Sequence, residues 1–289
     1  MSLISGKLGK HTIGDNSPVR VAGIINLSKA SFYSTSIATT TSEIETNIKQ
    51  MINEGAEYID IGAQSTRPIQ IYGGEGRVDE ATEKNQISQA IDIALDIIAS
   101  YNHVEISIDT MRKNVAEIAL NKGIRVINDI SGLKKEPDLA KLVADFGAAI
   151  ILMAAKEEPG DVYLIPDIKK ELHQSITLAE KAGIEPHKIA IDPGIGSWEA
   201  RPYHHDFIII NNLLGFRELS KPLYLGISRK TSIGKVLNDA PASDRLYGSL
   251  GATSVSVLYG AHVIRTHDVK PTIEVTRVVE ALKFYAKEE

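Results

Sequence analysis

The chain has 289 residues, 43% of them hydrophobic, and its 37 acidic and 32 basic side chains give a formal net charge of −5. A chain of this length buries roughly three quarters of the surface that its unfolded form exposes, so its core needs neither a disulfide nor a structural metal. The sequence has no cysteine, which excludes zinc fingers, iron–sulfur ligation and thiol nucleophiles. The mild acidity, without a run of lysine or arginine, argues against non-specific nucleic-acid binding.

The hydrophobic segments are too short to suggest a membrane protein. The longest apolar run, Ala148 to Ala155, falls far short of the ~20 residues that span a bilayer. The segment MSLISGKLGK at the start lacks the apolar centre of a signal peptide. We therefore expect a soluble, cytoplasmic protein that has no membrane partner.

A repeating unit of a short strand followed by a helix organises the chain. Eight β-branched runs end in a polar residue, at 21–26, 58–62, 105–109, 126–129, 149–153, 189–192, 223–228 and 262–266. The stretches between them have apolar residues at helical spacing, as in Ile44, Ile48, Met51 and Ile52. This alternation predicts parallel strands joined by crossover helices.

Eight such units match an α/β protein with the (β/α)8 TIM-barrel fold, which usually needs ~250 residues. A doubly wound sheet is the alternative, but no GxGxxG and no GxxxxGK[ST] motif is present. Ser42 and Glu45 predict a capping box at the start of the first helix. We expect a single domain over residues 1–289, with residues 1–18 as an N-terminal lead-in that forms a hairpin at the barrel floor.

Polar residues recur where the predicted strands end. They are Asn26, Asp60, Asp109, Asn128, Asp192, Ser228, Arg229, Lys230, Arg265 and His267. In a barrel these ends converge on one mouth, so the residues form one candidate site. The alternative is that each merely caps the helix that follows. Acceptors gather on the first six strands and cations on the last two, and this segregation favours a shared site.

The two halves of this set suit different chemistry. Lys230, Arg265 and His267 would give charge-assisted donors at the usual phosphate position of the fold. Carboxylate and amide oxygens on the other strands suit the N–H edge of an amino-substituted ring. The sequence therefore predicts a site for a nitrogen heterocycle joined to a phosphate or diphosphate. His204 and His205 are adjacent without a metal motif, which is typical of a surface helix start.

In these motifs the chain resembles the dihydropteroate synthases, members of the pterin-binding (β/α)8 family. The matching segments follow the family order over nearly the whole chain: GIINLSKASF, GAEYIDIGAQSTRP, ISIDT, VINDISG, IDPGIG, GISRK, GSLGA and RTHD. Each motif is weak alone, but eight in order, each at a predicted strand end or its following helix, are specific. The resemblance implies displacement of diphosphate from a hydroxymethyl-dihydropterin diphosphate by an aromatic amine, as in folate biosynthesis.

The resemblance also implies roles for residues. Catalysis would fall to Lys230, Arg265 and His267, and Mg²⁺ would be held at the diphosphate end with Asn26 as its ligand. Substrate binding would involve Asp109, Asn128, Asp192, Lys230, Thr66, Arg67, Pro68 and Thr231. The partners implied are these small molecules and a second copy of the chain, in a homodimer built through the late helices.

Several segments depart from the family pattern. Ser28–Tyr33 lacks the usual acidic residue, Ser197–Glu199 replaces a phenylalanine and a lysine, Ala154 replaces a histidine, and Ala63–Gln64 replaces Gly-Glu. These changes cluster on the side expected for the amine. They leave open whether the amine is p-aminobenzoate or a larger ribosylated aminobenzene.

The amine prediction depends on charge. With the loop lysine absent, Trp198 offers a stacking face and the pocket should favour a carboxylate less, unless Lys29 or Arg201 restores the cation. Two other functions remain as alternatives. One is a pterin-dependent methyltransferase, which needs no diphosphate site, and the other is a non-catalytic pterin-binding protein.

Overall fold

A computed structural model describes residues 3–28, 38, 40–64, 78–196 and 201–286. Its centre is an eight-stranded parallel sheet in the order β8-β7-β6-β5-β4-β3-β10-β9. The strands are β3 (Arg20–Asn26), β4 (Tyr58–Gly62), β5 (Glu105–Asp109), β6 (Val126–Asp129), β7 (Ala149–Met153), β8 (Ile189–Asp192), β9 (Tyr224–Leu225) and β10 (Val263–Thr266). A parallel bridge between Ile191 and Leu223 joins β8 to β9 and closes the sheet into a barrel, as predicted.

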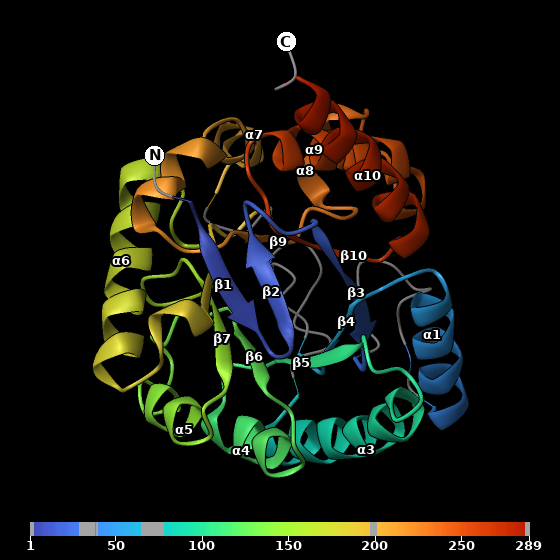
Figure 1. The fold of residues 1–289 in the computed structure, drawn as a ribbon, viewed down its shortest axis with the longest axis vertical. Coiled ribbons are helices and arrows are strands. Elements are labelled where there is room, and N and C mark those ends of the chain that lie inside the picture. Colours follow the sequence, from blue (N-terminus) through green and yellow to red (C-terminus); the bar gives the residue numbers. More distant parts are fainter. Residues whose placement is uncertain (1–2, 29–37, 39, 65–77, 197–200, 287–289) are drawn as a thin grey trace.

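Helices surround the barrel (Figure 1). They are α1 (Thr41–Asn53), α3 (Glu80–Ile98), α4 (Lys113–Asn121), α5 (Leu139–Asp145), α6 (Ile165–Lys181), α7 (His204–Asn211), α8 (Thr231–Val236), α9 (Leu246–Leu258) and α10 (Val269–Tyr285). Short 3₁₀ segments lie at Pro186–Lys188, Leu213–Leu219 and Ala242–Asp244. In the described part of the chain, none of the helices has the length and hydropathy needed to cross a membrane.

Two local predictions need correction. The first helix is capped by Thr40, whose hydroxyl accepts from the Glu43 amide at 3.3 Å while the Glu43 carboxylate accepts from the Thr40 amide at 3.0 Å. The predicted box of Ser42 and Glu45 is wrong because Ser42 already lies inside the helix. The strand predicted at 223–228 is shorter: β9 covers Tyr224–Leu225, with Leu223 bridged to Ile191, and the chain then turns into the loop before α8.

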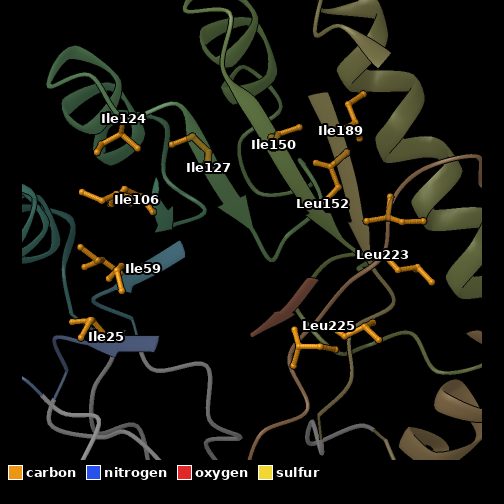
Figure 2. Close-up of a cluster of buried hydrophobic side chains, with 14 of the residues drawn as sticks. Ile25, Ile59, Ile106, Ile124, Ile127, Ile150, Leu152, Ile189, Leu223 and Leu225 are labelled. Carbon is orange, nitrogen blue, oxygen red and sulfur yellow. The ribbon is translucent and has the colours of Figure 1, made fainter. Parts of the chain in front are cut away.

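The strands bury both faces, as parallel strands do when helices cover the sheet. Along each strand, alternate residues point outward and pack against the helices in one large apolar cluster. Figure 2 shows members of this cluster, among them Ile25, Ile59, Ile106 and Ile127, on the successive strands β3, β4, β5 and β6. The residues between them, such as Tyr58 and Asp60 on β4, therefore point into the barrel.

The amino ends of the strands are plugged by a hairpin. Strands β1 (Ser5–Leu8) and β2 (His11–Gly14) pair antiparallel and lie across the barrel in Figure 1. Leu8 and Ile13 join an apolar cluster of inward-facing strand residues: Ala22, Tyr58, Val126, Ala149, Ile151, Ala190, Tyr224 and Val263. The Tyr58 hydroxyl donates to the Leu8 carbonyl at 3.1 Å. The lead-in is thus part of the barrel core.

A polar cluster fixes this end of the barrel. Arg217 donates to both oxygens of Asp15 at 2.8 and 2.7 Å, and the Ile4 amide donates to the same carboxylate at 2.8 Å. The Leu223 amide donates to Nδ1 of buried His262 at 2.9 Å, so the ring proton is on Nε2, 3.3 Å from Asp15. Burial lowers the pKa of His262, in agreement with a neutral ring.

Candidate active site

Alternate residues of each strand point into the barrel. At the amino end, around the hairpin, these residues are apolar, and at the carboxyl end, here called the mouth, they are polar. Asp109, Asn128, Asp192 and Arg265 share the inward-facing positions of their strands, and Asp109 pairs in register with Asn128. Asp60 also points inward from β4, two residues beyond Tyr58, but it pairs in register with Ser107 and so lies one inward-facing position below Asp109. The structure therefore brings the predicted ring-binding residues and one predicted cation together.

Arg265 lies between two carboxylates. Its Nε donates to Oδ2 of Asp60, and its Nη2 donates to Oδ2 of Asp109 at 3.0 Å. Both carboxylates hold the pKa of the guanidinium above its ordinary value despite burial. Burial raises the pKa of Asp109, and the charge of Arg265 opposes this rise. The unliganded mouth thus neutralises its main cation with its own acids.

Asp60 is the site residue that sequence reasoning left without a role. Its side chain is fully buried, and its Oδ1 accepts from the Ser107 hydroxyl. Its Oδ2 accepts from Nδ2 of Asn128, at 3.3 Å. The available signal was its inward position in the alternation of β4, where a buried charge demands a partner. That partner, Arg265, is 205 residues away in the chain.

Asp192 and Lys230 influence each other electrostatically at the mouth. Burial raises the pKa of Asp192 to about 6, although the Gly194 amide donates to its Oδ1 at 2.7 Å and Lys230 favours its ionised form. Burial lowers the pKa of Lys230, and Arg265 lowers it further, while Asp192 opposes both effects. Each of the two groups therefore helps to keep the other charged.

His267 differs from the sequence expectation of a charged donor. Burial and the nearby cations, Arg265 first, lower its pKa to about 3, so the ring is neutral at pH 7. The Ser228 hydroxyl oxygen accepts from the His267 backbone amide at 3.2 Å and lies 3.0 Å from ring Nδ1. The neutral ring carries one N–H and one acceptor nitrogen, and the direction of the Ser228 bond to Nδ1 depends on which ring nitrogen holds the proton.

Arg229, between these residues in the sequence, is structural. It adopts a left-handed backbone with φ of 56°, which is uncommon for a residue with a side chain. Its guanidinium binds both oxygens of Asp268 at 2.8 and 2.7 Å and donates to the carbonyls of Ala242 and Ser243. These bonds hold the loop in the strained conformation that turns Lys230 into the N-cap position of α8.

The remaining predicted residues have mixed outcomes. Asn26 is the last residue of β3, pairs with Gly62 and is partly exposed. Its backbone carbonyl accepts from the Ala38 amide at 2.9 Å. Thr231 is the first residue of α8 and is buried. Thr66, Arg67 and Pro68 lie outside the described residues, as do the altered positions 29–33 and 197–199.

A buried network beside the mouth joins Gln64 and Val78 to Glu83, Thr110 and Arg112. Glu83, on α3, accepts from the Thr110 hydroxyl and Arg112 at 2.7 Å each and from the Gln64 amide at 2.6 Å. Gln64 also exchanges two hydrogen bonds with the backbone of Val78, at 2.9 and 3.4 Å. The network therefore ties the end of β4 to the start of α3 and to the residue after Asp109.

Arg201 is buried and cannot act as a free cation toward a ligand. Its guanidinium donates to Asp206 at 2.6 Å and to the carbonyls of Val162, Gly194 and Gly196. The side chain is 0% exposed. Arg201 therefore holds the two sides of segment 197–200 together, and the sequence hypothesis that it restores the missing lysine charge does not fit this geometry.

Comparison with known proteins agrees with this arrangement. The family model for pterin-binding enzymes matches residues 22–267, which include every site residue described above from Asn26 to His267. The chain belongs to the pterin-binding enzyme family. The dihydropteroate synthase of Bacillus subtilis is 34% identical over 262 residues, which cover 91% of this chain and 88% of that protein.

Solved structures of the family superpose closely. The dihydropteroate synthase of Yersinia pestis with a sulfonamide drug has a TM-score of 0.85 and 28% identity, covering 98% of this chain and 100% of that one. The dihydropteroate synthase of Coxiella burnetii in complex with pteroic acid has a TM-score of 0.83 and 33% identity, covering 96% and 98%. The fold of this pterin-binding enzyme is therefore that of the dihydropteroate synthases.

Proposed function

We propose that this pterin-binding enzyme is a dihydropteroate synthase, a transferase that joins a dihydropterin methylene to an aromatic amine and releases diphosphate. The observation that carries the proposal is the mouth itself, where ring-type acceptors and phosphate-type donors face the same space from different strands. The Bacillus, Yersinia and Coxiella relatives bear this name. Pteroic acid, held by the Coxiella relative, is the pterin–aminobenzoate product that such a reaction forms.

The acidic side of the mouth binds the pterin in this proposal. Asp192 can accept two parallel N–H bonds from an amino-pyrimidinone edge, which fixes the ring by geometry and by charge. Because its pKa in the free protein is about 6, Asp192 is ionised and ready to accept at pH 7. Asp109 and Asn128, paired in register, offer acceptors along the rest of the ring.

The basic side binds the leaving group. Arg265 uses Nε and Nη2 on the two carboxylates, and its Nη1 has no hydrogen-bond acceptor among the described residues. Together with Lys230 and the neutral ring of His267 it stabilises the negative charge that grows on diphosphate as the C–O bond breaks. The amine nitrogen then attacks the methylene carbon and loses its proton, so no protein nucleophile is needed.

We infer that Mg²⁺ enters with the diphosphate and is not held by a resident protein cage. Among the described residues, no group of three acidic or histidine side chains could hold a metal. Mg²⁺ commonly binds one or two protein oxygens and completes its shell with water and substrate phosphates. Asn26, at the end of β3, fits the part of such a single oxygen ligand. The ion would neutralise charge on the leaving group.

The alternative functions fit the mouth less well. A methyltransferase that uses a pterin has no need of a cation cluster, yet Ser228 orders His267 and Arg265 is held in place beside it. A non-catalytic pterin-binding protein has no need of these groups either. The electrostatic attraction between Asp192 and Lys230 likewise serves a ligand that carries both an N–H edge and negative charge.

We further propose that the amine pocket is not tuned to p-aminobenzoate. The family lysine after the sixth barrel strand is missing from Ser197–Glu199, and the buried Arg201 donates to backbone carbonyls and Asp206. The pocket would then attract an amine's carboxylate less. Steady-state kinetics with a panel of aromatic amines tests this proposal. A kcat/KM for p-aminobenzoate of at least ~10⁴ M⁻¹s⁻¹, unmatched by larger amines, contradicts it.

The assay for the main proposal is diphosphate release from 6-hydroxymethyl-7,8-dihydropterin diphosphate with the same amine panel. We expect amine-dependent release that Arg265→Ala reduces by at least tenfold, because a charge-assisted donor to the leaving group is lost. Lys141→Ala, which alters an exposed cation of α5, is the matched control and should retain wild-type rates. Binding of the pterin without any diphosphate release would instead support the non-catalytic alternative.

We also propose a homodimer through α9 and α10, which pack side by side. Leu258 on α9 is 52% exposed, and Val278 and Leu282, one turn apart on α10, are 62% and 63% exposed. Apolar side chains gathered in this way are typical of a covered surface. Leu282→Glu should convert a dimer into a monomer in light scattering, whereas a wild-type monomer contradicts the proposal.

A further inference from the structure

Asp60 lies beneath the site, out of reach of a ligand. Its side chain is 0% exposed, while that of Asp109, the other carboxylate on Arg265, is 15% exposed. Both accept from the same guanidinium, Asp60 from Nε and Asp109 from Nη2. A ligand that enters the mouth can therefore replace Asp109 as a partner of Arg265 but cannot replace Asp60.

This difference has a consequence under the proposed function, on which the inference rests. When the pterin donates to Asp109, it competes with Nη2 of Arg265 for the same carboxylate. The guanidinium then keeps Asp60 as its fixed partner and turns its remaining donors to the diphosphate. Without Asp60, Asp109 would be the remaining carboxylate partner of Arg265. Binding of the pterin to Asp109 would then disturb the position of Arg265 that the diphosphate needs.

Asp60 also sets the direction of an amide. Asn128 Nδ2 lies 3.3 Å from Asp60 Oδ2, so this nitrogen faces down toward the carboxylate. The amide oxygen of Asn128 is then the atom that can accept from a ring N–H. Ser107, whose hydroxyl donates to Oδ1, holds Asp60 itself in place.

We propose that Asp60 is a positioning residue, which holds Arg265 toward the diphosphate and Asn128 toward the pterin while Asp109 is released to bind the ring. It touches no substrate and acts through the two side chains. A purely structural role, the neutralisation of a buried cation, would change stability alone. The positioning role changes the affinities for the two parts of the substrate, and its effect on the diphosphate requires Arg265.

The test is a double-mutant cycle with Asp60→Asn and Arg265→Ala, in which calorimetry measures binding of inorganic diphosphate and of 6-hydroxymethylpterin. We expect Asp60→Asn to weaken diphosphate binding roughly ten- to a hundredfold, the loss typical of one charge-assisted bond. In the Arg265→Ala background the same change should weaken it less than about twofold. In kinetics, Asp60→Asn should lower kcat/KM for the pterin diphosphate and leave the KM of the amine unchanged.

Asp129→Asn is the matched control. Asp129 is also fully buried at the end of a barrel strand, but among the described residues its carboxylate accepts from Ser131 and Leu133 and from none of the mouth residues. It should leave both affinities near wild type. If Asp60→Asn does not fold, Ser107→Ala gives the same cycle at lower amplitude, because it removes the hydroxyl that orients Asp60.

Two results overturn the inference: additive losses from Asp60→Asn and Arg265→Ala, or equal losses from Asp129→Asn. Both leave the proposed function intact, because the wild-type protein still binds both probes and releases diphosphate. A wild-type protein that binds neither probe contradicts the proposed function itself. Thermal melts of all variants separate lost affinity from lost folding.

Discussion

The two ends of one barrel differ in what fills them. At the amino end, hairpin residues such as Leu8 and Ile13 fill the interior with close-packed apolar groups. At the carboxyl end, two residues further along the same strands, the interior contains Asp60, Asp109 and Arg265. The same inward-facing positions thus stabilise the fold at one end and hold partly desolvated charge at the other.

This division shows how the chain separates stability from chemistry. Burying charge costs free energy unless it is paired, and the mouth pairs its charges with each other. The raised pKa of Asp192 and the lowered pKa of His267 indicate a remaining cost, which a ligand can relieve. The plug has the opposite character, since its apolar residues gain from burial alone.

The largest effect on stability is expected at the plug. Leu8→Ala should lower the free energy of unfolding by about 2–5 kcal/mol, because Leu8 is 1% exposed and its loss leaves a cavity. Urea denaturation measures the change. Leu3→Ala, at a position that is 68% exposed, should have almost no effect. Pterin affinity of the folded Leu8→Ala protein should equal that of the wild type, and a large fall would contradict the separation of the two ends.

At the mouth, Asp192→Asn should show the reverse pattern. Pterin affinity should fall by roughly ten- to a hundredfold, because a charged acceptor is lost and an amide donor can face the ring instead. Stability at pH 7 should not fall, since burial disfavours the charge of this carboxylate in the folded protein. Calorimetry and urea denaturation on the same sample check both parts. Unchanged affinity would remove Asp192 from the pterin site.

The pH dependence of binding follows from the same group. Asp192 has a pKa of about 6 in the free protein, so pterin affinity should rise between pH 5 and 7 and level off above it. Its contribution to stability has the opposite sign: between pH ~4 and 6 the folded chain binds more protons than the unfolded chain, so this contribution falls as the pH rises. Asp192→Asn should remove the part of this rise that Asp192 contributes, while Asp109, whose pKa burial also raises, still titrates.

The smallest expected effect on stability is at Tyr224, which lies inside the barrel between the apolar amino end and the charged mouth. Tyr224 is 1% exposed and faces the barrel interior, and its hydroxyl has no hydrogen-bond partner in the described structure. Asp60 and Arg265 influence its pKa, which burial raises well above the ordinary value. Tyr224→Phe should raise the free energy of unfolding by about 1 kcal/mol, because an unsatisfied buried hydroxyl is removed. A loss of stability would show that the hydroxyl is satisfied.

The fold was predictable because its signal is periodic and local. Apolar spacing and polar strand ends located the barrel strands to within a residue or two, except that β9 covers only Tyr224–Leu225. The capping box was misplaced because Thr40 and Ser42 offer the same chemistry, and only the backbone of Thr40 is extended. Local patterns do not distinguish such neighbours.

The residues of the site were predictable as a set, but their protonation states and ion-pair partners were not. Sequence reasoning found Asp109, Asn128, Asp192 and Arg265 because each ends a strand. It left Asp60 without a role because its partner Arg265 is remote in the chain. It also assigned a charge to His267, which burial removes. Such states depend on long-range packing, which motif spacing does not reveal.

The amide pair between Gln64 and Val78 has an evolutionary consequence. Because Glu83 and Arg112 hold both ends of the intervening segment to the barrel, the fold does not depend on what lies between them. Doubling the length of a loop with fixed ends costs only about 0.6 kcal/mol. Selection can therefore replace or lengthen the stretch between Gln64 and Val78 at little cost to the fold, while the barrel is inherited unchanged.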